Sequence, residues 1–426
     1  MTTEPRADRL RRELGLADAI GIGFGAIVGA GIFVVSGIAA GIAGPAFLIS
    51  LLIAAVAATC NALSSAQLAA EYPHSGGTYE YGYRVLSPAF GFAAGWMFIV
   101  SKLAAAGTVA IGAAAYLYAL LPGMNARVTA VGAIVLFTLL NYFGVRRSSR
   151  VNLVIVALAV GGLLVFVAAG AGHVRLDNLR PFAPAGPGSV LQAAALMFFA
   201  YTGYARIATL AEEVAEPRRT IPRAIHLTLG GAVVLYLAVG FVAMGVAGAG
   251  ALSATAAPLL VAARAIGGGW LTPMVAAAGV AAMLGVLLSQ VLGLSRMVLA
   301  MSRRSDLPAA LSAVHPKYGT PARAVVVIGG VAALIAWMGT LRDVAASAAF
   351  AILIYYGIAN MAALRMPASG KLYSDAVPRI GIAACAVLTL SLPVATIAVG
   401  TLILAAGFGA RLVLRSLAGP GQPRGD

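Results

Sequence analysis

Glycines recur through residues 22–33, inside an apolar run that is long enough to cross a lipid bilayer. A bilayer segment is normally an unbroken helix, because lipid offers no hydrogen-bond partner to a free backbone N–H or C=O group. Each glycine in a helix costs about 1 kcal/mol relative to alanine, so Gly29-Ala30-Gly31 predicts a break at mid-membrane depth. The free N–H groups of such a break can bind a small polar or charged ligand.

A second apolar run repeats this anomaly. Between Phe198 and Tyr204 it carries aromatic rings, a hydroxyl group and Gly203 in the middle of a predicted span. Gly31 and Gly203 lie 172 residues apart, which is close to the length of five predicted spans. Two halves of five spans have opposite orientations because five is odd. Paired interruptions in two inverted halves indicate the binding site of a transporter.

Lys102 is an ionisable residue that the sequence places near the middle of a span. It lies 14 residues after Pro88, where the span begins, and this corresponds to about 20 Å of helix. A lysine at that depth costs roughly 2.5–3.5 kcal/mol on insertion scales. The functional interpretation is a proton-coupling group, and the structural alternative is a lysine packed against backbone carbonyls or a helix end.

The remaining reactive side chains predict neither a metal site nor an enzyme. His173 is expected in a solvated loop with no second histidine near it in sequence, and Cys60 and Cys385 are expected to be buried in apolar spans. An intramembrane enzyme would need a nucleophile with its base, or metal ligands, at membrane depth. No cofactor is expected, because the glycines of residues 21–25 do not follow a β-strand.

The composition defines a membrane protein. Hydrophobic residues make up 61% of 426 positions, charged residues make up 10%, and the mean hydropathy is +0.94. The apolar stretches predict an all-α protein with about twelve transmembrane helices at 17–40, 45–70, 88–120, 127–144, 151–171, 189–211, 224–248, 271–300, 323–339, 344–364, 379–395 and 396–413. The expected domains are a basic tail (1–16), a five-helix repeat (17–171), a second, inverted repeat (189–364), two additional helices (379–413) and a second tail (414–426).

The distribution of positive charge predicts the orientation. A formal charge of +15 is compatible with nucleic-acid binding, but the arginines are spread over many short loops between apolar spans, which excludes a nucleic-acid partner. With the N-terminus inside, 21 of the 29 lysines and arginines fall on the cytoplasmic side and five on the other side. This asymmetry predicts that both termini are cytoplasmic.

Three segments carry a resemblance to a known family. Residues 25–33, residues 198–204 with 212–222, and Ser295-Arg296 with Asp306-Leu307-Pro308 resemble motifs of the amino acid-polyamine-organocation permeases. The match runs in order over almost the whole chain. It implies the 5+5 inverted-repeat fold of the bacterial leucine transporter, with broken helices 1 and 6 plus two extra helices, in the inner (plasma) membrane of a bacterial cell.

The resemblance also implies roles for the residues at the two breaks. The first helix would bind the substrate carboxylate on backbone N–H groups, and the sixth would offer carbonyls to the substrate ammonium, with aromatic rings as a lid or pocket wall. The implied substrate-binding residues are Ile27, Val28, Gly29, Ala30, Gly31, Ile32, Phe199, Ala200, Tyr201, Thr202 and Gly203. Side-chain preference would come from Ile27, Val28, Tyr204 and Phe350, which suggest an apolar pocket.

Two departures from the family pattern bear on substrate and coupling. Many relatives carry an acidic residue where this chain has Ala205 followed by Arg206, so a cationic substrate loses one anchor. Proton-coupled relatives can carry a lysine where this chain has Ala159, and we expect Lys102 to replace it. Arg206 is expected to pair with Glu212 or Glu213. Sodium coupling is the alternative, with Ser289 as a possible cation ligand.

The sequence therefore predicts a secondary active transporter that moves an amino acid, neutral or apolar, by alternating access. Coupling to protons or exchange is expected. The alternative is a permease for a polyamine or another small metabolite. A channel is disfavoured because no filter sequence or repeated charge stripe appears. The expected partners are the small-molecule substrate, protons and the lipid bilayer, and the oligomeric state is left open.

Overall fold

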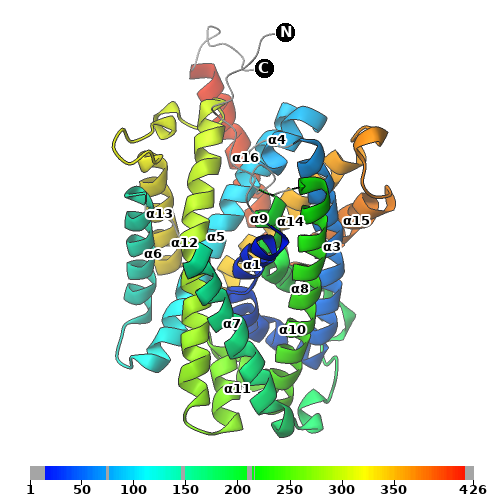
Figure 1. The fold of residues 1–426 in the computed structure, drawn as a ribbon, viewed down its shortest axis with the longest axis vertical. Helices are drawn as coiled ribbons and strands as arrows, with labels where there is room; N and C mark the ends of the chain where they lie inside the picture. Colours follow the sequence, from blue (N-terminus) through cyan, green and yellow to red (C-terminus); the bar gives the residue numbers. More distant parts are fainter. Residues whose placement is uncertain (1–14, 73–75, 145–148, 209–213, 215, 418–426) are drawn as a thin grey trace.

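The computed structural model describes residues 15–72, 76–144, 149–208, 214 and 216–417, and every regular element within these ranges is a helix (Figure 1). The predicted tails fall largely outside the described residues. The first half contains α1 (Leu16–Ile27), α2 (Ser36–Ala43), α3 (Phe47–Glu71), α4 (Thr78–Tyr81), α5 (Pro88–Leu120), α6 (Ala126–Tyr142) and α7 (Ser149–Gly170). Short π or 3₁₀ segments accompany them: η2 (Gly31–Val35), η3 (Gly44–Ala46), η4 (Gly82–Leu86) and η5 (Ala171–His173).

The rest of the described chain is also helical. It contains α8 (Gly186–Tyr201), α9 (Ala205–Ala208), α10 (Pro217–Ser253), α11 (Pro258–Ile266), α12 (Leu271–Arg303), α13 (Ala322–Met338), α14 (Leu341–Leu364), α15 (Ala376–Leu390) and α16 (Val394–Leu417). The short segments are η6 (Leu176–Leu179), η7 (Thr202–Tyr204), η8 (Ala309–Ser312) and η9 (Ala368–Gly370). Most long helices run along the long axis of the molecule, with α1 near its middle (Figure 1).

Local chemistry explains where several helices begin. Pro88 occupies the first position of α5, where its fixed φ suits a helix and its missing N–H is not needed. Asn125 caps α6, because its Oδ1 accepts hydrogen bonds from the N–H groups of Arg127 and Val128 at 3.0 and 3.2 Å. Thr340 caps α14 in the same way, accepting the N–H of Asp343 at 3.2 Å.

The apolar length of the helices indicates a multi-pass membrane protein. Within the described residues, seven helical stretches are long and apolar enough to cross a bilayer, and α6, α13 and α15 are shorter apolar helices. Burial separates an inner group of helices from an outer one. The most apolar window of α14 is 78% buried, whereas that of α16 is 17% buried and exposes large side chains such as Leu402 and Leu412. Such an apolar surface suits lipid and not water.

Two parts of the second half differ from the sequence-based expectation. Helix α10 begins at Pro217, not near 224, because a proline at the first helical position is tolerated, and Pro222 lies inside the helix. Helix α11 was not predicted, because nine residues are too few to register as a membrane span. It forms because Leu259, Leu260 and Ala263 bury one face against the neighbouring helices.

Small residues let the inner helices pack closely. Helix α5 packs against α12 and α14. A Cβ atom at Gly112 would lie 2.6 Å from Val34 and 2.9 Å from Met283, and one at Gly95 would lie 2.6 Å from Tyr79. Close backbone approach through small residues is the usual way in which helices associate in lipid. This packing holds α5 and α12 around the interrupted segment that follows α1.

Candidate functional site

The first predicted break is an interruption of helical backbone directly after α1. Val28 is extended, with φ −76° and ψ 104°, and helical backbone resumes at Ala30 and continues as the π segment η2. The Val28 N–H still donates to the Phe24 carbonyl at 2.8 Å, and the Phe33 N–H donates to the Gly29 carbonyl at 3.2 Å. The N–H groups of Ala30, Gly31 and Ile32 belong to the first turn of the new segment, where a helix has no carbonyl to offer them.

The second break follows α8. Helix α8 ends at Tyr201 and the chain continues as the 3₁₀ segment η7 and the short helix α9. Both the Thr202 N–H and the Thr202 hydroxyl donate to the Phe199 carbonyl, the hydroxyl at 2.9 Å. A carbonyl oxygen has two lone pairs, so the Phe199 carbonyl can accept both hydrogen bonds where the α-helix tightens into a 3₁₀ turn.

The two interruptions lie in direct contact. A Cβ atom built on Gly31 would lie 2.4 Å from the Cα atom of Ala200, and one built on Gly203 would lie 2.3 Å from the carbonyl carbon of Ala26. Neither position has room for any side chain, because the obstructing atoms belong to the opposite backbone. Glycine is therefore required at both positions, and its role is close approach of the two main chains.

Three tyrosine hydroxyls from other helices hold the carbonyls of the interrupted segments. Tyr236 on α10 donates to the Ile27 carbonyl at 2.9 Å and lies 3.4 Å from the Ala200 carbonyl, so it spans both interruptions. Tyr116 on α5 donates to the Phe33 carbonyl at 2.6 Å, and Tyr356 on α14 donates to the Thr202 carbonyl at 3.3 Å. Sequence reasoning gave none of these three tyrosines a role at the interruptions. The available signal was a tyrosine deep in an apolar helix, which normally needs a partner for its hydroxyl.

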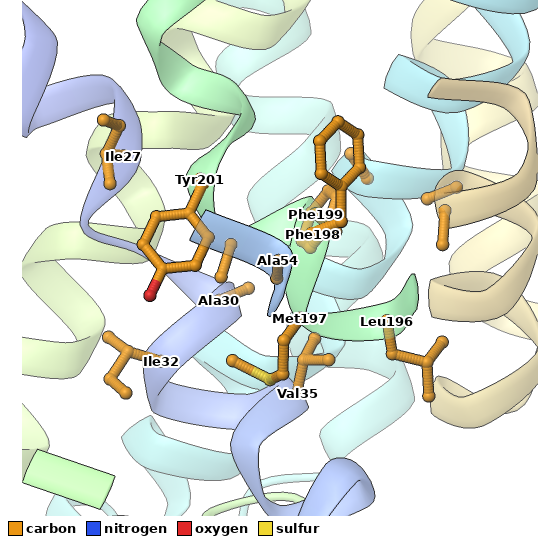
Figure 2. Close-up of a cluster of buried hydrophobic side chains, with 14 of the residues drawn as sticks. Ile27, Ala30, Ile32, Val35, Ala54, Leu196, Met197, Phe198, Phe199 and Tyr201 are labelled. Atoms are coloured by element: carbon orange, nitrogen blue, oxygen red, sulfur yellow. The ribbon is translucent and has the colours of Figure 1, made fainter. Parts of the chain in front are cut away.

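The interruptions are closed to solvent. Ile27, Val28, Ala30, Ile32, Ala200, Tyr201 and Thr202 are each at most 4% exposed, and Phe199 is 9% exposed. In Figure 2 the Tyr201 ring lies on one side of the α8 ribbon, and the rings of Phe198 and Phe199 lie on the other. The buried Tyr201 hydroxyl has no hydrogen-bond partner among the described residues. An unpaired buried hydroxyl costs about 1–3 kcal/mol, which a polar ligand at this position would recover.

Phe350 does not face the interruptions. A Cβ atom on Gly400 would lie 2.2 Å from the Phe350 ring, so this ring faces α16. The expectation that Phe350 tunes side-chain preference beside Ile27 and Val28 is therefore wrong, because its ring packs on α16 instead.

The predicted coupling residues lie on the helices that surround the interruptions. Lys102 is half-buried on α5, with its Nζ atom 5.7 Å from the centre of the Phe98 ring. The Ser289 hydroxyl donates to the Val286 carbonyl at 2.9 Å. A Cβ atom on Gly29 would lie 2.9 Å from Val286, so this turn of α12 packs against the first interruption.

Two further expectations concern an ion pair of Arg206 and the presence of a metal site. The pairing of Arg206 with Glu212 or Glu213 lies outside the described residues. Among the residues that the structure does describe, no group of three or more His, Cys, Asp or Glu side chains is arranged to hold a metal ion.

A buried charged cluster closes one end of the molecule. Asp306, which follows α12, accepts hydrogen bonds from Tyr79 at 2.9 Å and from Tyr83, and it pairs with Arg411 at 2.8 Å and Arg415 at 3.2 Å on α16. These five residues are called the Asp306 cluster below. Burial is the main cause that raises the pKa of Tyr83 to about 12, and the hydrogen bond to Asp306 is the second cause. Tyr83 therefore stays protonated as a donor at neutral pH.

Sequence reasoning found this end of the molecule only in part. The chain is helical from Thr78 through Leu86, in the connection between two predicted spans, and residues 73–75 lie outside the described ranges. The helix forms because Tyr79, Glu80 and Tyr81 are buried against the rest of the fold. Glu80 also pairs with Arg84 and with Arg304, the latter at 2.7 Å. Charge distribution predicts only an orientation role for Arg411, whereas its guanidinium is buried and paired with Asp306.

The all-helical architecture, the apolar helices and the buried contact between two interrupted helices define a multi-pass membrane protein of the transporter class. The chain belongs to the amino acid permease family, whose model matches residues 18–415.

Three relatives illustrate the range of that similarity. An uncharacterised transporter of Mycobacterium tuberculosis (strain ATCC 25618 / H37Rv) is 42% identical over 410 residues, which cover 96% of this chain and 92% of the relative. The branched-chain amino acid permease of Bacillus subtilis (strain 168) is 34% identical over 356 residues, covering 79% and 77%. The methylthioribose transporter of the same organism is 31% identical over 442 residues, covering 95% of both.

Proposed function

We propose that this protein is a secondary active transporter that moves a neutral, apolar amino acid by alternating access. The observation that carries the proposal is the contact of the two interruptions at Gly31 with Ala200 and at Gly203 with Ala26. We infer that this contact places the first-turn N–H groups near carbonyls of residues 199–202, a pairing suited to a carboxylate and an ammonium on one carbon. Because these residues are buried, a ligand can enter only if surrounding helices move.

The proposed architecture is the 5+5 inverted repeat of the leucine transporter. Residues 17–171 and 189–364 form the two repeats, and 379–413 add two helices, which gives twelve spans. The equivalent positions of Gly31 and Gly203 in the two halves support this division. The concentration of 21 lysines and arginines on one side supports cytoplasmic termini in a bacterial inner membrane.

The substrate preference rests on the chemistry beside the first interruption. Ile27 and Val28 are buried and apolar, and Ala205 offers no carboxylate to a cationic side chain. The relative that is named a branched-chain amino acid permease supports this choice. The second candidate is another small metabolite, supported by the relative that is named a methylthioribose transporter and covers 95% of this chain.

The proposed coupling is to protons or to counter-transported substrate, with Lys102 as the proton-coupling residue. Sodium coupling through Ser289 is the alternative. The packing of the Val286 turn on Gly29 supports a place for Ser289 beside the substrate. A fixed ammonium group on a neighbouring helix would disfavour a second cation at short range.

Exchange in proteoliposomes tests the proposal. The purified full-length protein is reconstituted with internal unlabelled leucine and no ion gradient, and labelled leucine, lysine, putrescine or methylthioribose is supplied outside. We expect accumulation of leucine and its apolar analogues only. Accumulation of methylthioribose or putrescine alone, or of no probe by a protein shown to be folded, would overturn the amino-acid assignment.

A further inference from the structure

An apolar groove lies away from the two interruptions, between the last helices of the chain. Helix α15 packs against α14 and α3, whereas α16 packs against α14 and α5. A groove of about 600 Å³ remains between α15 and α16, and α5 and α14 complete its walls. Its lining is almost entirely apolar and includes Phe90, Ile354, Met361, Ile382, Leu390 and Phe408.

The length and exposure of the groove suit a lipid chain. Along α14 it runs from Leu353 to Met361, and along α15 from Ile382 to Leu390. Eight residues of helix correspond to about 12 Å, which is close to the roughly 15 Å of one leaflet of the hydrocarbon core. Both Phe90 and Leu390 remain substantially exposed, at 41% and 75%, so the groove opens to its surroundings.

Two arginines continue the helices that line the groove beyond one end of its lining. Arg365 follows Met361 by four residues and Arg379 precedes Ile382 by three, so each continues a helix face that lines the groove. The short connection from α14 to α15 brings these two exposed arginines to the same end of the molecule. The acid of this connection, Asp375, pairs with Lys371 at 2.6 Å, and this hydrogen bond is the main cause that lowers its pKa, to which the charge of Arg379 also contributes.

We infer that the groove binds an anionic phospholipid of the bilayer, with an acyl chain between α15 and α16 and the phosphate at Arg365 and Arg379. Charge complementarity selects this occupant, because basic pockets at the membrane interface bind anionic headgroups through charge-assisted hydrogen bonds. A second copy of the chain is disfavoured, because a twofold contact at this face would bring the same arginines together.

Lipid binding to the purified full-length protein tests the inference. The delipidated protein is incubated with palmitoyl-oleoyl phosphatidylglycerol or with phosphatidylcholine carrying the same chains, and bound lipid is counted by native mass spectrometry. We expect phosphatidylglycerol to bind at least tenfold more tightly. A photoreactive phosphatidylglycerol should crosslink to peptides of α14, α15 or α16.

Variants separate the headgroup from the chain. Arg365→Gln with Arg379→Gln should abolish the preference for phosphatidylglycerol while the weaker binding of phosphatidylcholine persists. Gly357→Leu should reduce both, because it fills the groove. A Cβ atom at Gly357 meets only Cys385, at 3.9 Å, so the fold has room for the change. Matched controls are Arg303→Gln and Gly330→Leu, which alter an exposed arginine and an exposed glycine on other helices.

Three outcomes would overturn the inference. Equal affinity of the unaltered protein for both lipids would leave the arginines without a headgroup role. Phosphatidylglycerol binding that survives Gly357→Leu would place the lipid elsewhere. Loss of a dimer in Gly357→Leu without any change in bound lipid would assign the groove to a second copy of the chain. Transport is not measured in these assays, so their result is independent of the substrate proposal.

Discussion

At the scale of single residues, the candidate site is built from backbone groups that tyrosines and glycines position. Tyr236 donates to the Ile27 carbonyl and lies near the Ala200 carbonyl, so one hydroxyl relates the two interruptions. Gly31 and Gly203 permit the main chains to touch. Polar backbone in a membrane is tolerated only where protein or a cavity satisfies it. The tyrosines therefore stabilise the interruptions, and in our proposal the N–H groups of the first turn bind the substrate.

Replacing Gly31 should separate the two interruptions. In Gly31→Ala the new Cβ atom would lie 2.4 Å from the Ala200 backbone, so one main chain must move. Overpacking of this kind typically costs about 1–3 kcal/mol. We expect at least a tenfold loss of labelled leucine exchange. The matched control is Gly21→Ala on α1, where a Cβ atom meets nothing within 4 Å, and equal activity of the two variants would contradict the prediction.

Removing the Tyr236 hydroxyl should destabilise the same contact without changing its shape. Tyr236→Phe leaves the buried Ile27 carbonyl without this donor, and a buried unsatisfied group costs about 1–3 kcal/mol. We expect a lower midpoint of thermal unfolding in detergent and a higher half-saturating leucine concentration for exchange. Tyr118→Phe serves as the control because Tyr118 is 51% exposed. If Tyr236→Phe and Tyr118→Phe unfold at the same midpoint temperature, the Tyr236 hydroxyl does not stabilise the contact.

The residue scale also shows what the sequence could predict about the site. Glycine spacing is enough to predict the breaks near residues 29 and 203, because a similar glycine-containing interruption recurs 172 residues later inside an apolar span. The partners of the freed carbonyls were not predictable, since Tyr116 and Tyr236 lie on helices whose rotation depends on tertiary packing. The error at Phe350 has the same cause. Its helix face was unknown until α16 was placed beside it.

At the scale of elements, the Asp306 cluster ties three segments that are distant in sequence. It joins α4 and η4, the end of α12 and the last turns of α16. The positions of the helices could be read from apolar length, but this connection could not, because charge counting treats Arg411 as a surface residue. Its side chain is 7% exposed and is paired with a carboxylate that is fully buried.

Neutralising the Asp306 carboxylate should loosen these elements from one another. Asp306→Asn leaves the buried Arg411 guanidinium without its counter-ion, and breaking a buried ion pair from one side costs about 3–5 kcal/mol. We expect a clear drop in the midpoint of thermal unfolding and faster proteolysis near residues 78–86. Asp177→Asn, in an exposed segment, is the control. If both variants unfold at the same temperature, the cluster does not hold the end of the molecule together.

At the scale of the whole molecule, a buried site inside an apolar bundle needs a cycle that exposes it and an energy source for that cycle. Lys102, on the α5 helix that packs against both α12 and α14, is our candidate for linking proton movement to this cycle. In Lys102→Ala, we expect leucine exchange without ion gradients to persist. Uptake driven by an inward proton gradient should fall at least tenfold, because the alanine cannot bind or release a proton.

The same variant distinguishes coupling from a structural role. A lysine that only supports packing would, when removed, lower exchange and gradient-driven uptake together and also lower the midpoint of thermal unfolding. Lys317→Ala, in an exposed loop, controls for the loss of one positive charge. If proton-driven uptake is unchanged in Lys102→Ala, another group couples transport to protons. Uptake that then depends on sodium would favour Ser289, because a serine hydroxyl next to the first interruption can ligate a cation but cannot carry a proton at neutral pH.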